Sequence, residues 1–101
     1  MKRKMKVIAE LVISPVGEGV SLSKYVQEAV NVIESFPNIR VEHHSMGTNI
    51  EADDIDTILK VTKKAHESLF KVGCKRVVTT LKIDDRKDKP RIMEDKVKAL
   101  E

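Results

Sequence analysis

The order in which the hydrophobic repeat changes along the chain is the strongest constraint on its fold. Between Lys6 and Ser14 apolar side chains recur at alternate positions, which is typical of a strand with one dry face. After Ser21, an expected N-cap, they return at the three- and four-residue spacing of an amphipathic helix. The same two periods predict strands over residues 6–14, 39–46, 48–52 and 76–84, and helices over residues 21–36, 53–72 and 91–100.

This order of elements predicts a ferredoxin-like fold of the α+β class. With right-handed crossovers, a strand-helix-strand-strand-helix-strand chain forms a four-stranded antiparallel sheet whose first and third strands are central. The two longer helices then cover one sheet face. The length of 101 residues suits one domain over residues 1–101, with a basic leader at 1–5 that frays and a short helix after the last strand.

The second face of the expected sheet has no helix over it. Alternation places the following side chains there, together with alternate residues of 48–52: Ile8, Glu10, Val12, Ser14, Val78, Thr80 and Lys82. The aliphatic members make this face too apolar to be left in water. We therefore expect a second copy of the chain to pack against it, which would also stabilise a domain with a modest core of its own.

Charge and composition exclude several classes of partner. Nineteen Lys and Arg against sixteen Asp and Glu give a net charge of +3, and the chain has one Tyr, two Phe and no Trp. These numbers favour neither a polycationic surface nor an aromatic platform for bases, so nucleic acid is not an expected partner. No apolar run approaches the roughly 20 residues that cross a bilayer, so no membrane contact is expected. The single Cys74, expected to be a buried small hydrophobe, indicates a reducing, cytoplasmic setting.

The sequence contains no arrangement of residues that predicts catalysis or a metal site. His43 and His44 alternate across a strand, so they point to opposite faces and cannot hold one metal ion together, while His66 is expected to be a satisfied core residue. No nucleophile, base and orienter are recognisable as a set. The loop from Pro15 to Ser21 is either a plain turn or an anion site built from backbone amides. The charged run 84–89 is expected to be a solvated turn with local ion pairs.

Three motifs, taken in order and spacing, resemble the small thiamine-binding protein family, the YkoF-like group. They are Ser-Pro-Val-Gly at 14–17 with Ser-Leu-Ser-Lys-Tyr-Val at 21–26, Ser-Met-Gly-Thr-Asn-Ile-Glu at 45–51, and Lys-Ile-Asp-Asp-Arg at 82–86 before Lys96-Val97. The resemblance covers the chain from about Val7 to Val97. It implies a ferredoxin-like protein of the cytoplasm that is not an enzyme, binds thiamine or a related hydroxymethylpyrimidine, and assembles through its sheets. The expected assembly is a homotetramer built as a dimer of dimers.

The resemblance also implies a set of ligand-binding residues at or near the interface between subunits. Matched to this chain, they are Ser14, Gly17, Met46, Gly47, Thr48, Asn49, Glu51, Lys82 and Asp84. The chemistry of thiamine adds two more, because its thiazolium ring is a permanent cation and its aminopyrimidine presents a donor beside an acceptor. Glu10 supplies a carboxylate on a central strand, and Tyr25 is the aromatic residue that flanks the helix stripe instead of joining the core. No catalytic residue, metal ligand or cofactor is expected.

Other interpretations of the same residues stay open. Glu10 and Lys82 could equally well neutralise one another across an interface. The chain could be an oligomeric regulatory or scaffold protein that binds no small molecule. It could also be an anion-responsive accessory protein that uses the 15–21 loop with Lys82.

Overall fold

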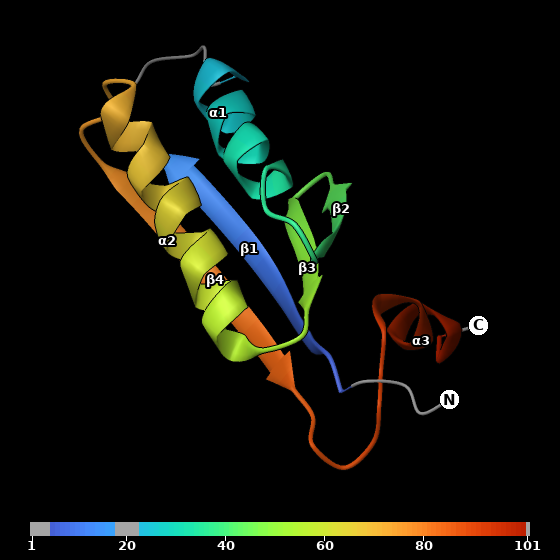
Figure 1. The fold of residues 1–101 in the computed structure, drawn as a ribbon. Coiled ribbons are helices and arrows are strands. Elements are labelled where there is room, and N and C mark those ends of the chain that lie inside the picture. The colour runs from blue at the N-terminus through green and yellow to red at the C-terminus, as the bar shows by residue number, and fades with distance from the viewer. Residues whose placement is uncertain (1–4, 18–22, 101) are drawn as a thin grey trace.

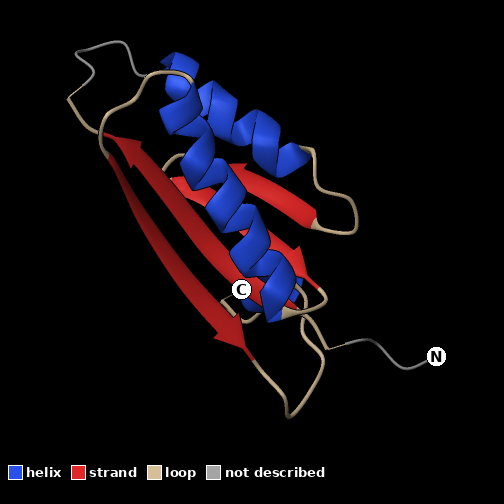
Figure 2. Ribbon diagram, turned by 60° about the vertical axis from the view of Figure 1, so that its left-hand side comes forward, coloured by secondary structure: helices blue, strands red, loops and turns tan. Residues whose placement is uncertain are grey.

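The computed structural model describes residues 5–17 and 23–100. Its elements are β1 (Val7–Pro15), α1 (Ser23–Glu34), β2 (Arg40–His44), β3 (Gly47–Ala52), α2 (Ile55–Lys71), β4 (Val77–Asp85) and α3 (Met93–Lys98). The strands form one antiparallel sheet in the order β2-β3-β1-β4, and α1 and α2 lie side by side on one of its faces (Figures 1 and 2). The predicted ferredoxin-like α+β fold is confirmed. No helix in the described ranges is long and apolar enough to cross a membrane.

The core lies between the sheet and its two covering helices. Strand alternation turns Val7, Ala9 and Leu11 of β1 towards the helices, and all three are buried. Ile50 of β3 and Ile33 of α1 are buried in the same cluster. The opposite side chains of the central strands are thereby directed to the second face of the sheet, where the candidate site lies.

The buried stripe predicted for the second helix is correct at two positions and wrong at others, because the helix is rotated about its axis relative to the prediction. The side chains expected to continue one stripe were Ile55, Ile58, Leu59, Thr62, His66 and either Leu69 or Phe70. Ile58 and Leu69 are buried as predicted, but Ile55, Leu59 and Phe70 are exposed. The side chains that α2 buries are Ile58, Val61, Ala65, Ser68 and Leu69. The smaller side chains of this set let the helix approach the sheet closely, so the larger apolar ones are left at the margins of the contact.

The two ends of α2 follow local rules that were readable in the sequence. Asp54 is its N-cap and accepts hydrogen bonds from the backbone N of Thr57 at 2.8 Å and from Thr57 Oγ1 at 2.7 Å. Gly73, just past the helix, has a φ of 103°, which favours glycine. Ser21, the N-cap expected for the first helix, lies outside the described residues.

The β2–β3 hairpin turns one residue earlier than predicted. The expected turn was centred on Gly47, whereas Ser45 and Met46 form it and Gly47 is the first residue of β3. A Cβ on Gly47 would lie 2.9 Å from Cγ2 of Val12 and 3.0 Å from the carbonyl oxygen of Leu11. Glycine is required at this position because β3 passes close to β1, and not because the chain turns there.

The prediction that the second sheet face has no helix over it is wrong at one end. The short helix α3 returns to this face near the beginning of β1 (Figure 1), and its Met93 is buried together with Ile8 of β1. Sequence periodicity could not show this, since the course of the connection after β4 decides where the helix lies. The remainder of the face stays uncovered in the single chain, and Val78 on β4 is 47% exposed there.

Candidate functional site

A hollow of about 470 Å³ opens on the second sheet face, beside α3. It is lined by Ile8, Ala9, Glu10, Glu42, Asn49, Lys82, Ile83, Asp84, Asp85, Met93, Lys96 and Val97. All four strands and the last helix therefore contribute to it. Its volume lies within the range of roughly 300–1,000 Å³ that is usual for sites of small organic ligands.

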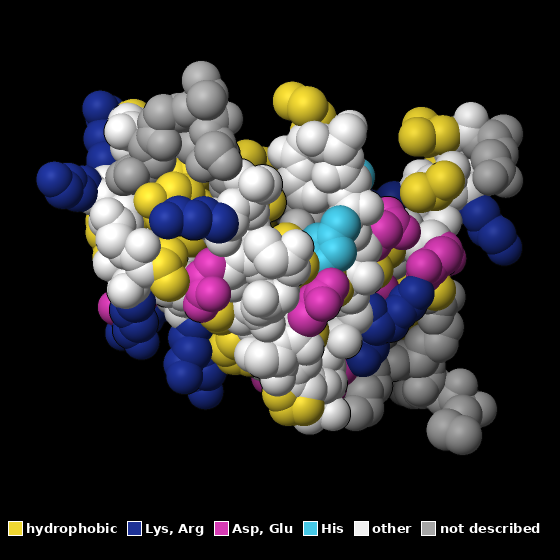
Figure 3. All heavy atoms as spheres, turned by 90° about the horizontal axis from the view of Figure 1, so that it is seen from above, with side chains coloured by type: hydrophobic (Ala, Val, Ile, Leu, Met, Phe, Trp, Pro, Cys, Tyr) yellow, Lys and Arg dark blue, Asp and Glu magenta, His cyan; other side chains and the backbone are white. Residues whose placement is uncertain are grey.

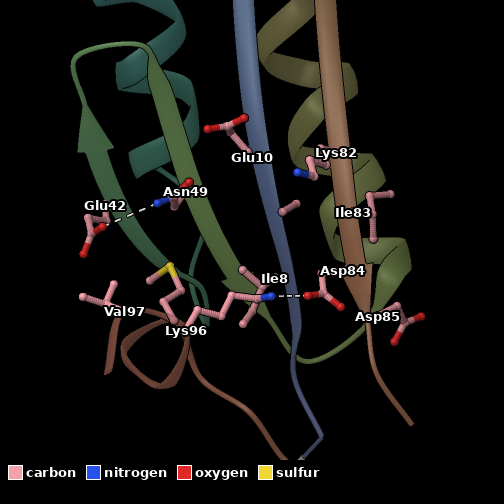
Figure 4. A pocket seen from close by; sticks show the side chains of 12 residues that line it. Ile8, Glu10, Glu42, Asn49, Lys82, Ile83, Asp84, Asp85, Lys96 and Val97 are labelled. Carbon is pink, nitrogen blue, oxygen red and sulfur yellow. Dashed lines mark hydrogen bonds and ion pairs between the residues drawn. The ribbon is translucent and has the colours of Figure 1, made fainter. Parts of the chain in front are cut away.

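Charged side chains surround an apolar floor in this hollow. The carboxylates are Glu10, Glu42, Asp84 and Asp85, and the ammonium groups are Lys82 and Lys96, so the lining has four negative charges against two positive ones. Figure 4 shows these groups on β1, β2, β4 and α3, with Ile8 between them. The excess of carboxylates makes the hollow complementary to a cation.

One edge of the hollow is an ion pair between β4 and α3. Nζ of Lys96 contacts Oδ2 of Asp84 across Ile8 (Figure 4). The hydrogen bond from Lys96 lowers the pKa of the Asp84 carboxyl below its ordinary value, against a smaller opposing effect of burial. Asp84 is therefore ionised at neutral pH, and it holds α3 against the sheet.

A second ion-pair network lies behind the hollow and fixes the other side of α3. The Glu51 side chain, only 2% exposed, accepts a hydrogen bond from the backbone N of Met93 at 2.9 Å and faces Nη1 of Arg40 at 3.3 Å. Nη2 of Arg40 donates to Oε2 of Glu94 at 2.6 Å, and this contact raises the pKa of Arg40 and lowers that of Glu94. Glu51 is thus an anchor for α3, because its carboxylate is already engaged by protein donors.

Glu10 lies beside a histidine as well as beside Lys82. The Nδ1 atom of His44 accepts the backbone N–H of Met46 at 3.2 Å, so in the neutral ring the proton is on Nε2. That Nε2 is 3.2 Å from Oε2 of Glu10, but it is buried without a properly aligned hydrogen bond, so the contact is electrostatic. Glu10 is also the register partner of Lys82 across β1 and β4.

A second hollow, of about 330 Å³, lies between α1 and the tip of the β2–β3 hairpin. Most of its lining is aliphatic: Leu11, Val12, Ile13, Val26, Ala29, Val30 and Ile33, with residues 43–48 of the hairpin. His43 lies on this side of the sheet, where Nε2 is 2.8 Å from Oε1 of Glu34 and Nδ1 is 3.0 Å from Oγ1 of Thr48. His43 and His44 therefore point to opposite faces, as predicted.

The structure divides the residues expected at the ligand site into separate groups. Glu10, Asn49, Lys82 and Asp84 meet at the first hollow, and Met46, Gly47 and Thr48 line the second. Ser14 is exposed on β1, and Gly17, with a φ of 81°, lies in the loop after it. Neither residue is part of the lining of these two hollows of the described chain. Residues 18–22 lie outside the described ranges, and with them most of the loop proposed as an anion site.

The expectation that Tyr25 stays outside the core is wrong. Its side chain is 7% exposed and packs with Ala29, Leu69 and Cys74 in a second core cluster. Cys74 is buried, as predicted. His66 is only half-buried rather than in the core, and its Nδ1 pairs with Oγ1 of Thr79 at 2.6 Å.

Sequence reasoning missed several residues of the first hollow. Glu42 had a usable signal, because alternation along β2 puts it on the same face as His44. Lys96 belonged to a quoted motif but had no place in the expected sheet. Val97 belonged to the same motif, whereas Met93 had no signal, since only the return of α3 to the sheet brings these side chains there.

The negative balance of the hollow is local. Seen from above, side chains of both signs are interspersed over the surface (Figure 3), and the charged turn after β4 contains the pairs Arg86–Asp88 and Lys87–Asp85. The whole chain has a net charge of +3. A carboxylate excess inside one concave site is therefore opposite to the character of the chain as a whole.

These features define a small ferredoxin-like protein with an acidic hollow between its sheet and its last helix. The sequence profile of the thiamine-binding proteins matches residues 9–101, and the chain belongs to that family. A UPF0045 protein of Methanocaldococcus jannaschii is 46% identical over 95 residues, which are 94% of this chain and 92% of the relative. The family resemblance drawn from the three motifs is confirmed.

Solved structures share this fold. A hypothetical protein of Methanocaldococcus jannaschii, 46% identical, superposes with a TM-score of 0.85 over 94% of this chain and 95% of its own. A protein of Thermotoga maritima whose name connects it with thiamine biosynthesis/salvage is 25% identical, with a TM-score of 0.79 over 95% of this chain and 99% of its own.

Proposed function

We propose that this chain binds thiamine or a related hydroxymethylpyrimidine in the hollow between the sheet and α3. The observation that carries the proposal is the carboxylate excess around an apolar floor of ligand size, in a member of the thiamine-binding protein family. Thiamine requires both properties, since it consists of two flat rings, one of which, the thiazolium, is a permanent cation.

The lining offers a partner for each part of such a ligand. The thiazolium cation would lie near the carboxylates of Glu10 and Glu42, and the aminopyrimidine would exchange hydrogen bonds with the side-chain amide of Asn49. Asn49 belongs to the lining of the hollow, and its Nδ2 lies 3.5 Å from Oε1 of Glu42 (Figure 4). Ile8 and Met93 provide the apolar surface against which a ring can pack.

The proposal includes self-association through the uncovered part of the sheet face. Val12 and Val78 lie there on neighbouring strands, and Ser14 pairs with Val78 in the register. A second copy packed on this face would cover the aliphatic patch and close the hollow from outside, which puts the ligand at or near the subunit interface. We propose a tetramer built as a dimer of dimers, located in the cytoplasm.

Calorimetric titration tests the binding proposal. We expect heat of binding with thiamine or with hydroxymethylpyrimidine, and a loss of affinity in Asn49→Ala and Glu42→Gln. Glu67→Gln is the matched control, because Glu67 is an exposed carboxylate on α2, on the far side of the sheet. If neither thiamine nor hydroxymethylpyrimidine binds, the proposed binding function is refuted. The chain would then be interpreted as an oligomeric scaffold protein that binds no small molecule.

The location and the chemistry need their own measurements. If Met46→Ala at the second hollow abolishes binding while Asn49→Ala leaves it intact, the ligand occupies the second hollow and the proposed location is wrong. Chromatography of the ligand after prolonged incubation should return it unchanged, as expected for a binding protein without catalytic activity. Sedimentation with and without thiamine measures the assembly and its dependence on ligand.

A further inference from the structure

We infer that the hollow selects the unphosphorylated form of its cationic ligand and rejects the phosphate and diphosphate esters. The inference rests on the proposed function and adds a specificity to it. It follows from the charges that line the hollow and from the contacts that already engage its cations.

The first step concerns the sign of the net charge on the side chains that line the hollow. Four carboxylates and two ammonium groups line the hollow. Asp85 is paired with Lys87, which is not part of the lining, and Asp84 is paired with Lys96. Glu10 and Glu42 against Lys82 therefore leave an excess of one negative charge. The site thus attracts a cation and repels an anion. An ester phosphate brings a charge of about −1.5 to −2 at neutral pH, which turns a cationic vitamin into a net anion. The charge balance therefore favours the free alcohol of the ligand over its esters.

The second step is that the cations near the hollow are engaged by carboxylates of the protein. Lys96 pairs with Asp84, and Arg40 is held between Glu51 and Glu94. Among the lining cations described, this leaves Lys82, which has Glu10 directly across from it in the sheet register. A phosphate at this site would have to take Lys96 from Asp84, which would also release α3 from β4.

The third step concerns geometry. Sites that hold phosphates commonly use a helix N-terminus or converging arginine side chains. At this hollow the first turn of α3 contains the acidic residues Glu94 and Asp95, and Asp95 itself accepts a hydrogen bond from the backbone N of Ile92 at 3.0 Å. The amide end of α3 is thus already satisfied by carboxylates, which reinforces the rejection of a phosphate.

The test compares thiamine with thiamine diphosphate by calorimetric titration of the full chain, without Mg²⁺ and at low ionic strength. We expect the diphosphate to bind at least about tenfold more weakly. Added NaCl should weaken thiamine binding and reduce the difference in affinity between thiamine and its diphosphate. Salt screens both the attraction of the carboxylates for the cation and their repulsion of the phosphates. If the difference in affinity between thiamine and thiamine diphosphate does not change with salt, the diphosphate is excluded by its size, and the inference is overturned.

Two charge-matched variants locate the effect. Glu42→Gln removes one carboxylate of the hollow and should reduce the ratio of the affinities for thiamine and thiamine diphosphate several-fold. Glu67→Gln on α2 makes the same change in net charge and should leave this ratio unchanged. The inference is rejected, and the proposed function is left in place, if the unmodified protein binds thiamine and thiamine diphosphate equally well. It is also rejected if the ratio of the two affinities is the same in Glu42→Gln and Glu67→Gln. Failure of thiamine, thiamine diphosphate and hydroxymethylpyrimidine alike to bind would instead refute the proposed function, and the inference with it.

Discussion

The backbone N–H of Met93 donates to the carboxylate of Glu51, with 2.9 Å between N and Oε2, and so fastens α3 to β3 across 42 positions of sequence. Glu51 is buried and also faces the guanidinium of Arg40. One carboxylate therefore connects the hairpin, the central part of the sheet and the helix that lines the hollow.

Replacing Glu51 by leucine should release α3. Glu51→Leu leaves the buried Met93 N–H without its acceptor and leaves Arg40 with Glu94 alone. A buried group that loses its partner costs about 1–3 kcal/mol. The free energy of unfolding in urea and the exchange rate of the Met93 amide measure the two effects. Glu94→Gln, which removes an exposed partner of the same Arg40, is the control and should change both far less. An unchanged Met93 exchange rate in Glu51→Leu would contradict this role of Glu51.

Acid should loosen α3 before it unfolds the sheet. The pKa values of Asp84 and Glu94 are lowered by Lys96 and Arg40, so their contribution to stability is complete above the ordinary carboxyl pKa and is lost as the pH falls through the lowered values. We therefore expect amide exchange in residues 93–98 to accelerate below about pH 4 while β1 and β3 stay protected. Lys96→Met should raise exchange in α3 at neutral pH and flatten its response to acid. The same acid response in that variant would argue against the Asp84–Lys96 pair as its source.

Adding a methyl group at Gly47 should destabilise the protein. In Gly47→Ala the new Cβ would meet Cγ2 of Val12 and the carbonyl oxygen of Leu11, and such overpacking costs about 1–3 kcal/mol. Denaturant unfolding measures the loss. Val12→Ala in the same chain should recover part of it, because it removes the side-chain clash and leaves the one with the backbone. Strict additivity of the two substitutions would show that the close approach to Val12 is not the cause.

Removing the cap of α2 should cost about 1 kcal/mol. Asp54→Ala deletes the acceptor of the Thr57 N–H, whereas Asp54→Asn keeps a side-chain oxygen in place. The difference in unfolding free energy between these variants gives the contribution of the cap. Asp56→Ala, in the first turn of the same helix, controls for the loss of a negative charge near the helix N-terminus. If Asp56→Ala costs as much as Asp54→Ala, charge and not capping is responsible.

The order and type of the main elements were predictable because they depend on local periodicity. Alternation in β1 and β4 assigned Glu10 and Lys82 to one sheet face, and the structure pairs them in register. The rotation of α2 was not predictable in the same way. Leu59 and Val61 are two positions apart and so lie on different sides of the helix, and only packing against the sheet decides which of them is buried.

The candidate site was predictable only to the extent that it is built on strands. Glu10, Asn49, Lys82 and Asp84 share a face through the two-residue repeat, so sequence alone could group them. Lys96 reaches the same place through the course of the connection after β4, which no periodicity encodes. Glu51 was expected to face the ligand on the same grounds as Asn49, but the return of α3 covers its carboxylate.

The position of α3 has a consequence for how the protein is made. A chain leaves the ribosome with its N-terminal end first, and α3 is translated after all four strands. The strands and the two covering helices are therefore all synthesised while the wall formed by Met93, Lys96 and Val97 is still missing. A nascent chain at that stage has the strands of the hollow without its last side, so the hollow is complete only once translation has passed this helix.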